Sequence, residues 1–181
     1  LSMEAWFDGL KRGRAMVSSG PLLEMEVGNA LPGDTVQLPP NGGSVVISGR
    51  LRSITELDDV ALYCNGKEVE RFPLTGNGTS LDINYSVRIE SSGWCHLRVE
   101  GDPDRRDVLD VAYAQAFTNP VWFQVGNEPI QDNDSANYAL NWIDKLQELA
   151  EAWPGWRSQS EKDHVFGQFD DARAVYRSKL D

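Results

Sequence analysis

The chain has 181 residues, of which 40% are hydrophobic and 25% are charged, values typical of one globular domain or of a domain with a small appendage. Its 28 Asp and Glu outnumber 17 Lys and Arg, which gives a net charge of -11. Binding to nucleic acid or to an anionic membrane surface requires positive charge, so we expect neither as a partner. No apolar run reaches the ~18 residues that a membrane-spanning helix needs.

The first segment, residues 3–16, predicts an amphipathic helix. Cationic residues follow its apolar part, where they favour the helix dipole, and Gly20-Pro21 then ends the helical pattern. We therefore assign residues 1–17 to a connecting helix whose apolar face needs a partner. Its apolar residues recur at i, i+3, i+4 and i+7 and share one face: Met3, Trp6, Phe7 and Leu10.

From residue 18 to 131 the hydrophobic period changes from helical to two. Residues 81–90 alternate apolar and polar without a fault, which is typical of an antiparallel strand with one buried face. Asn65-Gly66 joins the strand-like segments 60–64 and 68–72 and favours a type I′ β-hairpin. About eight or nine short strands separated by turns predict a mainly β fold, an immunoglobulin-like antiparallel β-sandwich. Further strands are expected at residues 23–27, 45–51, 94–99, 111–117 and 121–125.

The helical period returns in residues 132–181, which predict a helical hairpin. Asp134 can cap the first helix, and Pro154-Gly155 ends it. Ser158 and Glu161 fit a capping box at the start of the second helix. We expect this hairpin to pack on the sandwich or on a partner. The expected apolar stripe of the first helix is Ala139, Trp142, Ile143, Leu146, Leu149, Ala150 and Trp153, and that of the second is Val165, Phe166, Phe169, Ala172, Tyr176 and Leu180.

Candidate catalytic and metal-binding residues are few. His96 and His164 are far apart in the chain, and each reads as a solvated side chain on its own element. Cys64 and Cys95 lie in phase with apolar neighbours, which favours two buried free thiols. A bridge across the sandwich is the alternative, and it would imply an oxidising compartment. We therefore expect no catalytic residue, cofactor site or metal site in this chain, and its compartment stays undetermined.

Aromatic side chains in the strands allow two interpretations. Most of them are in register with apolar neighbours, which favours core packing. Exposed rings on one sheet face would instead indicate a carbohydrate-binding module. Whether Trp94 and Trp122 are buried or exposed distinguishes the two interpretations. Trp122 and Phe123 are adjacent in a strand, so one of them must face outward. This pair joins Trp6, Phe7 and Leu10 as a possible interface.

Several motifs resemble the C-terminal region of the CehA/McbA-like metal-dependent hydrolases of the PHP superfamily. The likeness begins with an aromatic helix ending in Gly13-Arg14 and continues with Ser19-Gly20-Pro21 at the turn into the first strand. It extends through most of the chain in a consistent order. The other matching motifs are Pro32-Gly33-Asp34, Val60 to Gly66, Thr118-Asn119-Pro120-Val121, Asn141-Trp142-Ile143-Asp144 and Ala172-Arg173-Ala174-Val175-Tyr176.

The resemblance implies that the catalytic, metal-bearing barrel precedes this chain. Hydrolysis and its divalent metals would then belong to that barrel, and this chain would be a non-catalytic domain that braces it. The expected partner is the upstream catalytic domain of the same polypeptide. A carbohydrate-binding module and a homodimerising structural domain, which would self-associate through the helical hairpin, remain the two alternatives.

Overall fold

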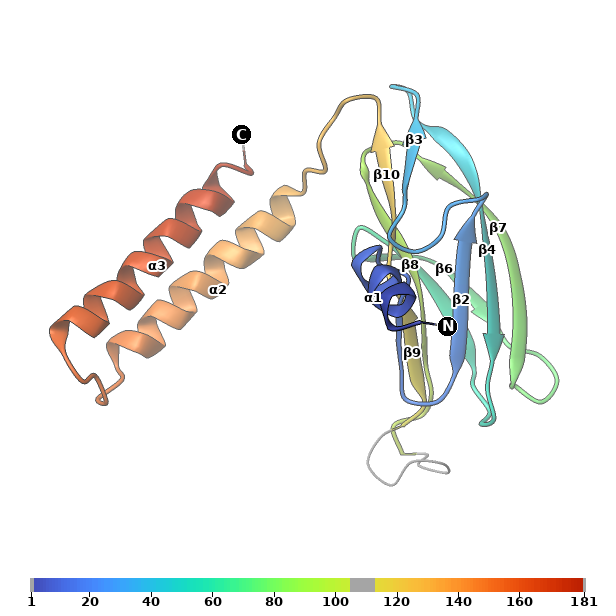
Figure 1. The fold of residues 1–181 in the computed structure, drawn as a ribbon, viewed down its shortest axis with the longest axis horizontal. Helices are drawn as coiled ribbons and strands as arrows, with labels where there is room; N and C mark the ends of the chain where they lie inside the picture. Colours follow the sequence, from blue (N-terminus) through green and yellow to red (C-terminus); the bar gives the residue numbers. More distant parts are fainter. Residues whose placement is uncertain (1, 105–112, 181) are drawn as a thin grey trace. The chain divides into compact units, whose positions relative to one another are not determined.

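The computed structural model describes residues 2–104 and 113–180 of a mainly β protein (Figure 1). The chain divides into two compact units, Leu1–Ile130 and Gln131–Asp181. Within the described residues, the first unit holds an N-terminal helix and ten strands in two sheets, and the second unit holds two helices. The predicted mainly β class with a helix at the start and helices at the end is confirmed.

Helix α1 (Met3–Lys11) is shorter than predicted. The expectation of a helix to residue 16 is wrong because Gly13 has a φ of 75°, a left-handed conformation that ends helices. The chain then forms a short strand, β1 (Met16–Ser18), before Gly20 and Pro21. At the other end, the Ser2 hydroxyl caps the helix by accepting a hydrogen bond from the Ala5 amide.

The larger sheet has seven strands. Its central path runs β1-β9-β8-β10-β3, with β9 (Gln115–Thr118), β8 (Gly93–Glu100), β10 (Val121–Val125) and β3 (Thr35–Leu38). The hairpin β5 (Asp59–Cys64) and β6 (Lys67–Pro73) joins it through β8. All pairs are antiparallel except β10 with β3, which is parallel. The start of the predicted strand 111–117 lies outside the described residues.

The smaller sheet has three antiparallel strands in the order β2-β4-β7. They are β2 (Leu22–Val27), β4 (Gly43–Arg52) and β7 (Ser80–Ile89). Exposed and buried residues alternate in β2, and polar and apolar residues alternate in β7. The strand predicted at residues 81–90 is therefore confirmed to within one residue at each end. Gly49 of β4 faces the other sheet so closely that an added Cβ would lie 2.6 Å from Cδ1 of Leu97.

One hydrophobic core joins the two sheets of the first unit. Leu23, Ile47 and Leu51 come from the smaller sheet, and Leu62 and Phe123 come from the larger one. All five are almost completely buried. At about 1.5–3 kcal/mol for each fully buried large apolar side chain, this cluster supplies much of the driving force for folding. The opposite face of each sheet is therefore left for contacts with solvent or ligands.

The predicted hairpin at Asn65-Gly66 is confirmed. Asn65 has a φ of 50° and Gly66 a φ of 75°, and a type I′ turn requires positive φ at both positions. Strand β5 also pairs with β8, which places Cys64 opposite Cys95 with a Cα–Cα distance of 4.1 Å, and the two are joined by a disulfide. The expectation of two free thiols is wrong, and the bridge lies within one sheet because both strands pair directly.

The second unit contains α2 (Asn133–Glu151) and α3 (Gln159–Arg177), which pack side by side. Asp132, and not Asp134, caps α2, because its carboxylate accepts hydrogen bonds from the amides at the first turn. At α3 the predicted N-cap forms, since the Ser158 hydroxyl accepts from the Glu161 amide at 3.1 Å, but the Glu161 carboxylate accepts from the Arg157 amide and not from that of Ser158. An ion pair and a hydrogen bond from Arg173 to Asp144 join the two helices.

Candidate functional site

The apolar face of α1 is exposed in the described structure. Trp6, Phe7 and Leu10 are 53%, 48% and 45% exposed, and no residue of α1 is buried. The rings of Trp6 and Phe7 contact each other edge to face, with centroids 5.1 Å apart. We call Met3, Trp6, Phe7 and Leu10 the α1 stripe. A nine-residue helix is marginal on its own, so its packing partner decides its stability.

A compact junction fixes the C-terminal end of α1 to the first unit. Arg14 forms an ion pair with Asp34, in which Nη2 donates to both carboxylate oxygens at 2.8 and 2.9 Å. Gly13 and Gly33 lie in backbone contact, and the amide of Asn119 donates to the Gly13 carbonyl. The Arg14 guanidinium holds the pKa of Asp34 below its ordinary value, mainly through the hydrogen bonds that it donates to the Asp34 carboxylate. Sequence analysis missed the junction because its members are distant in the chain.

Trp122 and Phe123 lie on opposite faces of β10. Phe123 is 1% exposed and belongs to the core, so it offers no surface to a partner. Trp122 is 36% exposed and points away from the core. The structure therefore separates these two candidate interface residues, and it leaves Trp122 as the exposed member of the pair.

Strand β8 also presents side chains on the outer face of the larger sheet. Cys95, Leu97 and Val99 are buried in the core, so the alternating residues Trp94 and His96 point outward. Trp94 lies directly opposite Trp122 on the neighbouring strand β10. Both indoles are thus outside the core, and the expectation of core packing is wrong for this pair.

An aromatic row continues across this face from Trp94. The ring centroids of Trp94 and His96, and those of His96 and Tyr63, are both 5.6 Å apart. We call Trp122, Trp94, His96 and Tyr63 the aromatic face. Arg98 lies 6.0 Å from the centroid of the Tyr63 ring, a cation–π distance.

Burial controls the ionisation of this row. Partial burial, and then the charge of Arg98, lowers the pKa of His96, so the neutral imidazole is favoured. Burial also raises the pKa of Tyr63, and the Glu68 carboxylate, which accepts a hydrogen bond from its hydroxyl, adds to the shift. The row therefore presents uncharged rings at neutral pH.

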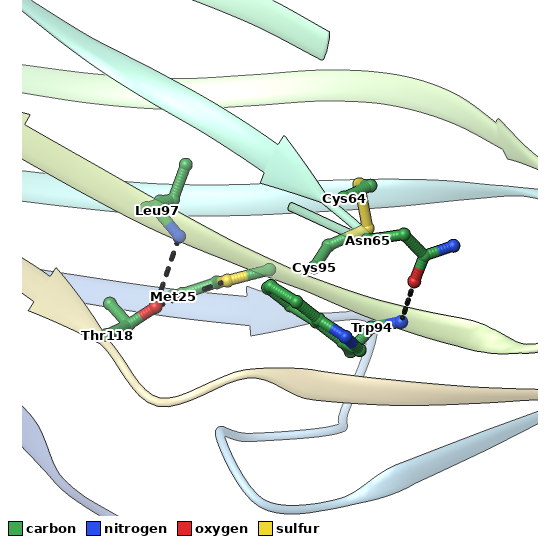
Figure 2. The surroundings of a disulfide bond; sticks show 7 residues. All are labelled: Met25, Cys64, Asn65, Trp94, Cys95, Leu97 and Thr118. Carbon is green, nitrogen blue, oxygen red and sulfur yellow. Dashed lines mark hydrogen bonds between the residues drawn. A yellow bond between two sulfur atoms is a disulfide. The ribbon is translucent and has the colours of Figure 1, made fainter. Parts of the chain in front are cut away.

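Asn65 positions Trp94 from the β5–β6 turn. Its side-chain oxygen accepts a hydrogen bond from the Trp94 amide at 3.0 Å, as Figure 2 shows. The same side chain lies over Gly93, where an added Cβ would come within 2.2 Å of it. The Cys64–Cys95 disulfide joins the same two strands one residue away (Figure 2). The turn and the disulfide together fix the strand segment that carries this indole.

A second exposed apolar surface lies on α2. Ile143 is buried in the hairpin, whereas Trp142 of α2 is 50% exposed. Trp153, which lies just after the end of α2, is 61% exposed. The predicted single stripe of α2 is therefore divided between two faces, because it was too broad for one neighbouring helix to cover. Tyr138 also belongs to the exposed set, which sequence analysis missed.

The other candidate groups lie apart from one another. His164 is exposed on α3, and the Asp102 side chain accepts a hydrogen bond from the Asp104 amide within a turn. Within residues 2–104 and 113–180, no group of three or more His, Cys, Asp or Glu side chains is placed to hold a metal ion. None of the described helices combines the length and hydropathy needed to cross a bilayer.

Comparisons with known proteins give similarity of structure only. No protein-family model and no curated protein sequence matches the chain. The chain is similar to the CARDB domain of PF1109 from Pyrococcus furiosus, at 15% identity and a TM-score of 0.38, over 59% of this chain and 97% of that one. It is also similar to a Niemann-Pick type C2 protein from the Japanese carpenter ant, at 10% identity and a TM-score of 0.30, over 61% of this chain and 99% of that one.

Proposed function

We propose that this chain is a non-catalytic accessory domain that docks, through the α1 stripe, on a PHP-type metal-dependent hydrolase domain preceding it in the same polypeptide. The observation that carries the proposal is a helix with exposed Trp6, Phe7 and Leu10 attached to a rigid junction. In this proposal the chain has an immunoglobulin-like β-sandwich, and the hydrolytic metals belong to the preceding domain.

The energetics of α1 support docking. Its nine residues bury no side chain against the first unit, so little tertiary packing holds the helix in place. Full burial of a large apolar side chain contributes about 1.5–3 kcal/mol, and the α1 stripe has four such side chains that a partner surface can cover. Docking would therefore stabilise both the helix and the interface that it forms.

The junction supports a bracing role. The Arg14–Asp34 pair and the Gly13–Gly33 contact fix the direction in which the chain leaves the first unit. A domain attached before α1 would then be held at a defined orientation. The Cys64–Cys95 disulfide supports the further proposal that the polypeptide works in an oxidising compartment, because disulfides persist there.

The first test uses the 181-residue chain with bis(p-nitrophenyl) phosphate and an aryl carbamate, in the presence of Zn²⁺ or Mn²⁺. We expect no turnover, and robust hydrolysis by this chain would contradict the proposal. The gene sequence upstream of Leu1 is the companion observation. We expect it to encode a His-x-His pair and further metal ligands, and a different preceding domain would also contradict it.

The second test uses the polypeptide extended to include the preceding domain. We expect Trp6→Ala combined with Leu10→Ala to lower the thermal midpoint of that domain. Ile54→Ala is the matched control, because Ile54 is an exposed apolar residue outside α1. Equal midpoints for the double variant and the control would show that the α1 stripe does not brace the preceding domain.

A further inference from the structure

The outer surface of the first unit is charged over most of the paired strands. On the larger sheet, Arg71 pairs with Asp59 and Glu68 on the β5–β6 hairpin. The smaller sheet presents charged residues that pair across its strands: Arg50 lies 3.4 Å and Arg52 lies 3.1 Å from a carboxylate oxygen of Asp82. Such exposed ion pairs contribute little to stability, but they keep a surface hydrated. This face is therefore an ordinary solvated surface.

The outer face of β3, β10 and the start of β8 carries no charge. Thr35 of β3 lies opposite Trp122 of β10, which in turn lies opposite Trp94 of β8. The next outward pair along the same strands is Gln37 with Gln124. In a chain where a quarter of the residues are charged, these five outward positions hold two indoles, two amides and one hydroxyl. We call these five residues the neutral patch.

We propose that the neutral patch is a binding site for an uncharged oligosaccharide. The C–H face of a pyranose ring packs on an indole, while its hydroxyl groups exchange hydrogen bonds with amides and hydroxyls. The patch has both kinds of group in adjacent rows: Trp122 and Trp94 in one, and Gln37 and Gln124 in the next. Nothing on it complements a charged ligand, so neither an acidic polysaccharide nor a phosphate fits.

The surrounding structure makes the patch a stable platform. Asn65 holds the backbone of Trp94, and the neighbouring Cys64–Cys95 disulfide fixes the strands beneath it. A preordered surface loses less conformational entropy when a ligand binds. This proposal is independent of docking through α1, because the α1 stripe and the neutral patch have no residue in common.

The test is isothermal titration calorimetry of the 181-residue chain with cellohexaose, laminarihexaose, xylohexaose, mannohexaose and chitohexaose. We expect at least one of these sugars to bind. The Trp122→Ala variant should then bind that sugar with a Kd roughly tenfold higher, which corresponds to the loss of one aromatic stacking contact. Trp153→Ala is the matched control, since that indole is exposed in the other unit, just after the end of α2. The Kd of this variant should equal that of the wild type.

Indole N–H resonances locate the ligand without a mutation. Six tryptophans give six signals in the ¹⁵N spectrum, and we expect the sugar to shift those of Trp94 and Trp122 but not that of Trp153. Trp122→Phe keeps an aromatic ring, so its affinity for the sugar should lie between those of the wild type and of Trp122→Ala. No binding of any of the five sugars at millimolar concentration, or binding that leaves the signals of Trp94 and Trp122 unmoved, would overturn the proposal. Light scattering in which Trp122→Ala abolishes a dimer, without any sugar binding, would assign the patch to self-association instead.

Discussion

Reduction of the Cys64–Cys95 disulfide is expected to destabilise the first unit by roughly 3–4 kcal/mol. The two cysteines are 31 residues apart, and the bridge therefore restricts a long segment of the unfolded chain. The loop-entropy relation gives about 3.7 kcal/mol at 25 °C for a loop of that length. Because β5 and β8 pair directly, the folded sheet can keep its register when the bridge opens. The effect thus arises mainly in the unfolded state.

The measurement compares urea unfolding of the oxidised protein with that of the same protein reduced by a phosphine. Reduction leaves both sulfur atoms in place and creates no cavity in the core, unlike Cys95→Ala. For a unit of this size, the loss corresponds to a fall in the thermal midpoint of roughly 10–15 °C. Hydrogen exchange followed by mass spectrometry should show faster exchange in β5 and β8.

Helices α2 and α3 provide the internal control, since they belong to the other compact unit and contain no cysteine. Their exchange rates should be the same before and after reduction. The loop-entropy reasoning is refuted if the free energy of unfolding of the first unit changes by less than about 0.5 kcal/mol on reduction. Free thiols at both positions, found by peptide mapping of protein prepared under oxidising conditions, would contradict the bridge itself.

Three further predictions concern the same unit. Gly49→Ala places a Cβ 2.6 Å from Leu97 Cδ1, so urea unfolding should show that the free energy of unfolding falls by about 1–3 kcal/mol. If that overlap is the cause, adding Leu97→Val to Gly49→Ala should recover part of the loss. Thr118→Val removes the hydroxyl that accepts from the buried Leu97 amide at 3.2 Å, and should lower the free energy of unfolding by about 1–3 kcal/mol. Thr118→Ser keeps the acceptor and should lower it less. Equal losses in the two variants would contradict the role of this hydrogen bond. Burial and a neighbouring arginine lower the pKa of His96, so the unfolded chain binds a proton more readily than the folded one, and stability should fall as the pH is lowered through the ordinary pKa of histidine. Urea midpoints at pH 8 and 5.5, compared with those of His96→Gln, check this, and an equal pH dependence in both proteins would refute it.

The elements that the sequence predicted best are those that depend on local pattern. Residues 81–90 alternate in period two, and Asn65-Gly66 selects a turn with positive φ at both positions. These signals act over a few residues, so no knowledge of topology is needed to interpret them. The N-cap at Ser158 is a third example, because its hydrogen bond spans only three residues.

The features that could not be predicted depend on pairing between distant segments. Strands β1 and β3 have only three and four residues, and they exist because they pair with β9 and β10, more than 80 residues later. The disulfide needs the register of β5 on β8, which the spacing of two cysteines does not reveal. The outward direction of Trp94 was within reach, because His96 was predicted to point outward and residues two apart in a strand share a face.

The contrast between the neutral patch and the charged surface around it is the basis of the proposed binding site. A face that only needs to stay hydrated is well served by charges, as in the arginine–carboxylate pairs around Asp82. Placing Trp94 and Trp122 opposite each other on the other sheet gives up that hydration without adding to the core, since both point away from it. The two rings bury part of their surface against each other and the sheet, which contributes to stability, but Trp122 remains 36% exposed. A ligand that covers the exposed part of the two rings would complete their burial, and this is why we propose binding at the neutral patch and not at the charged surface around it.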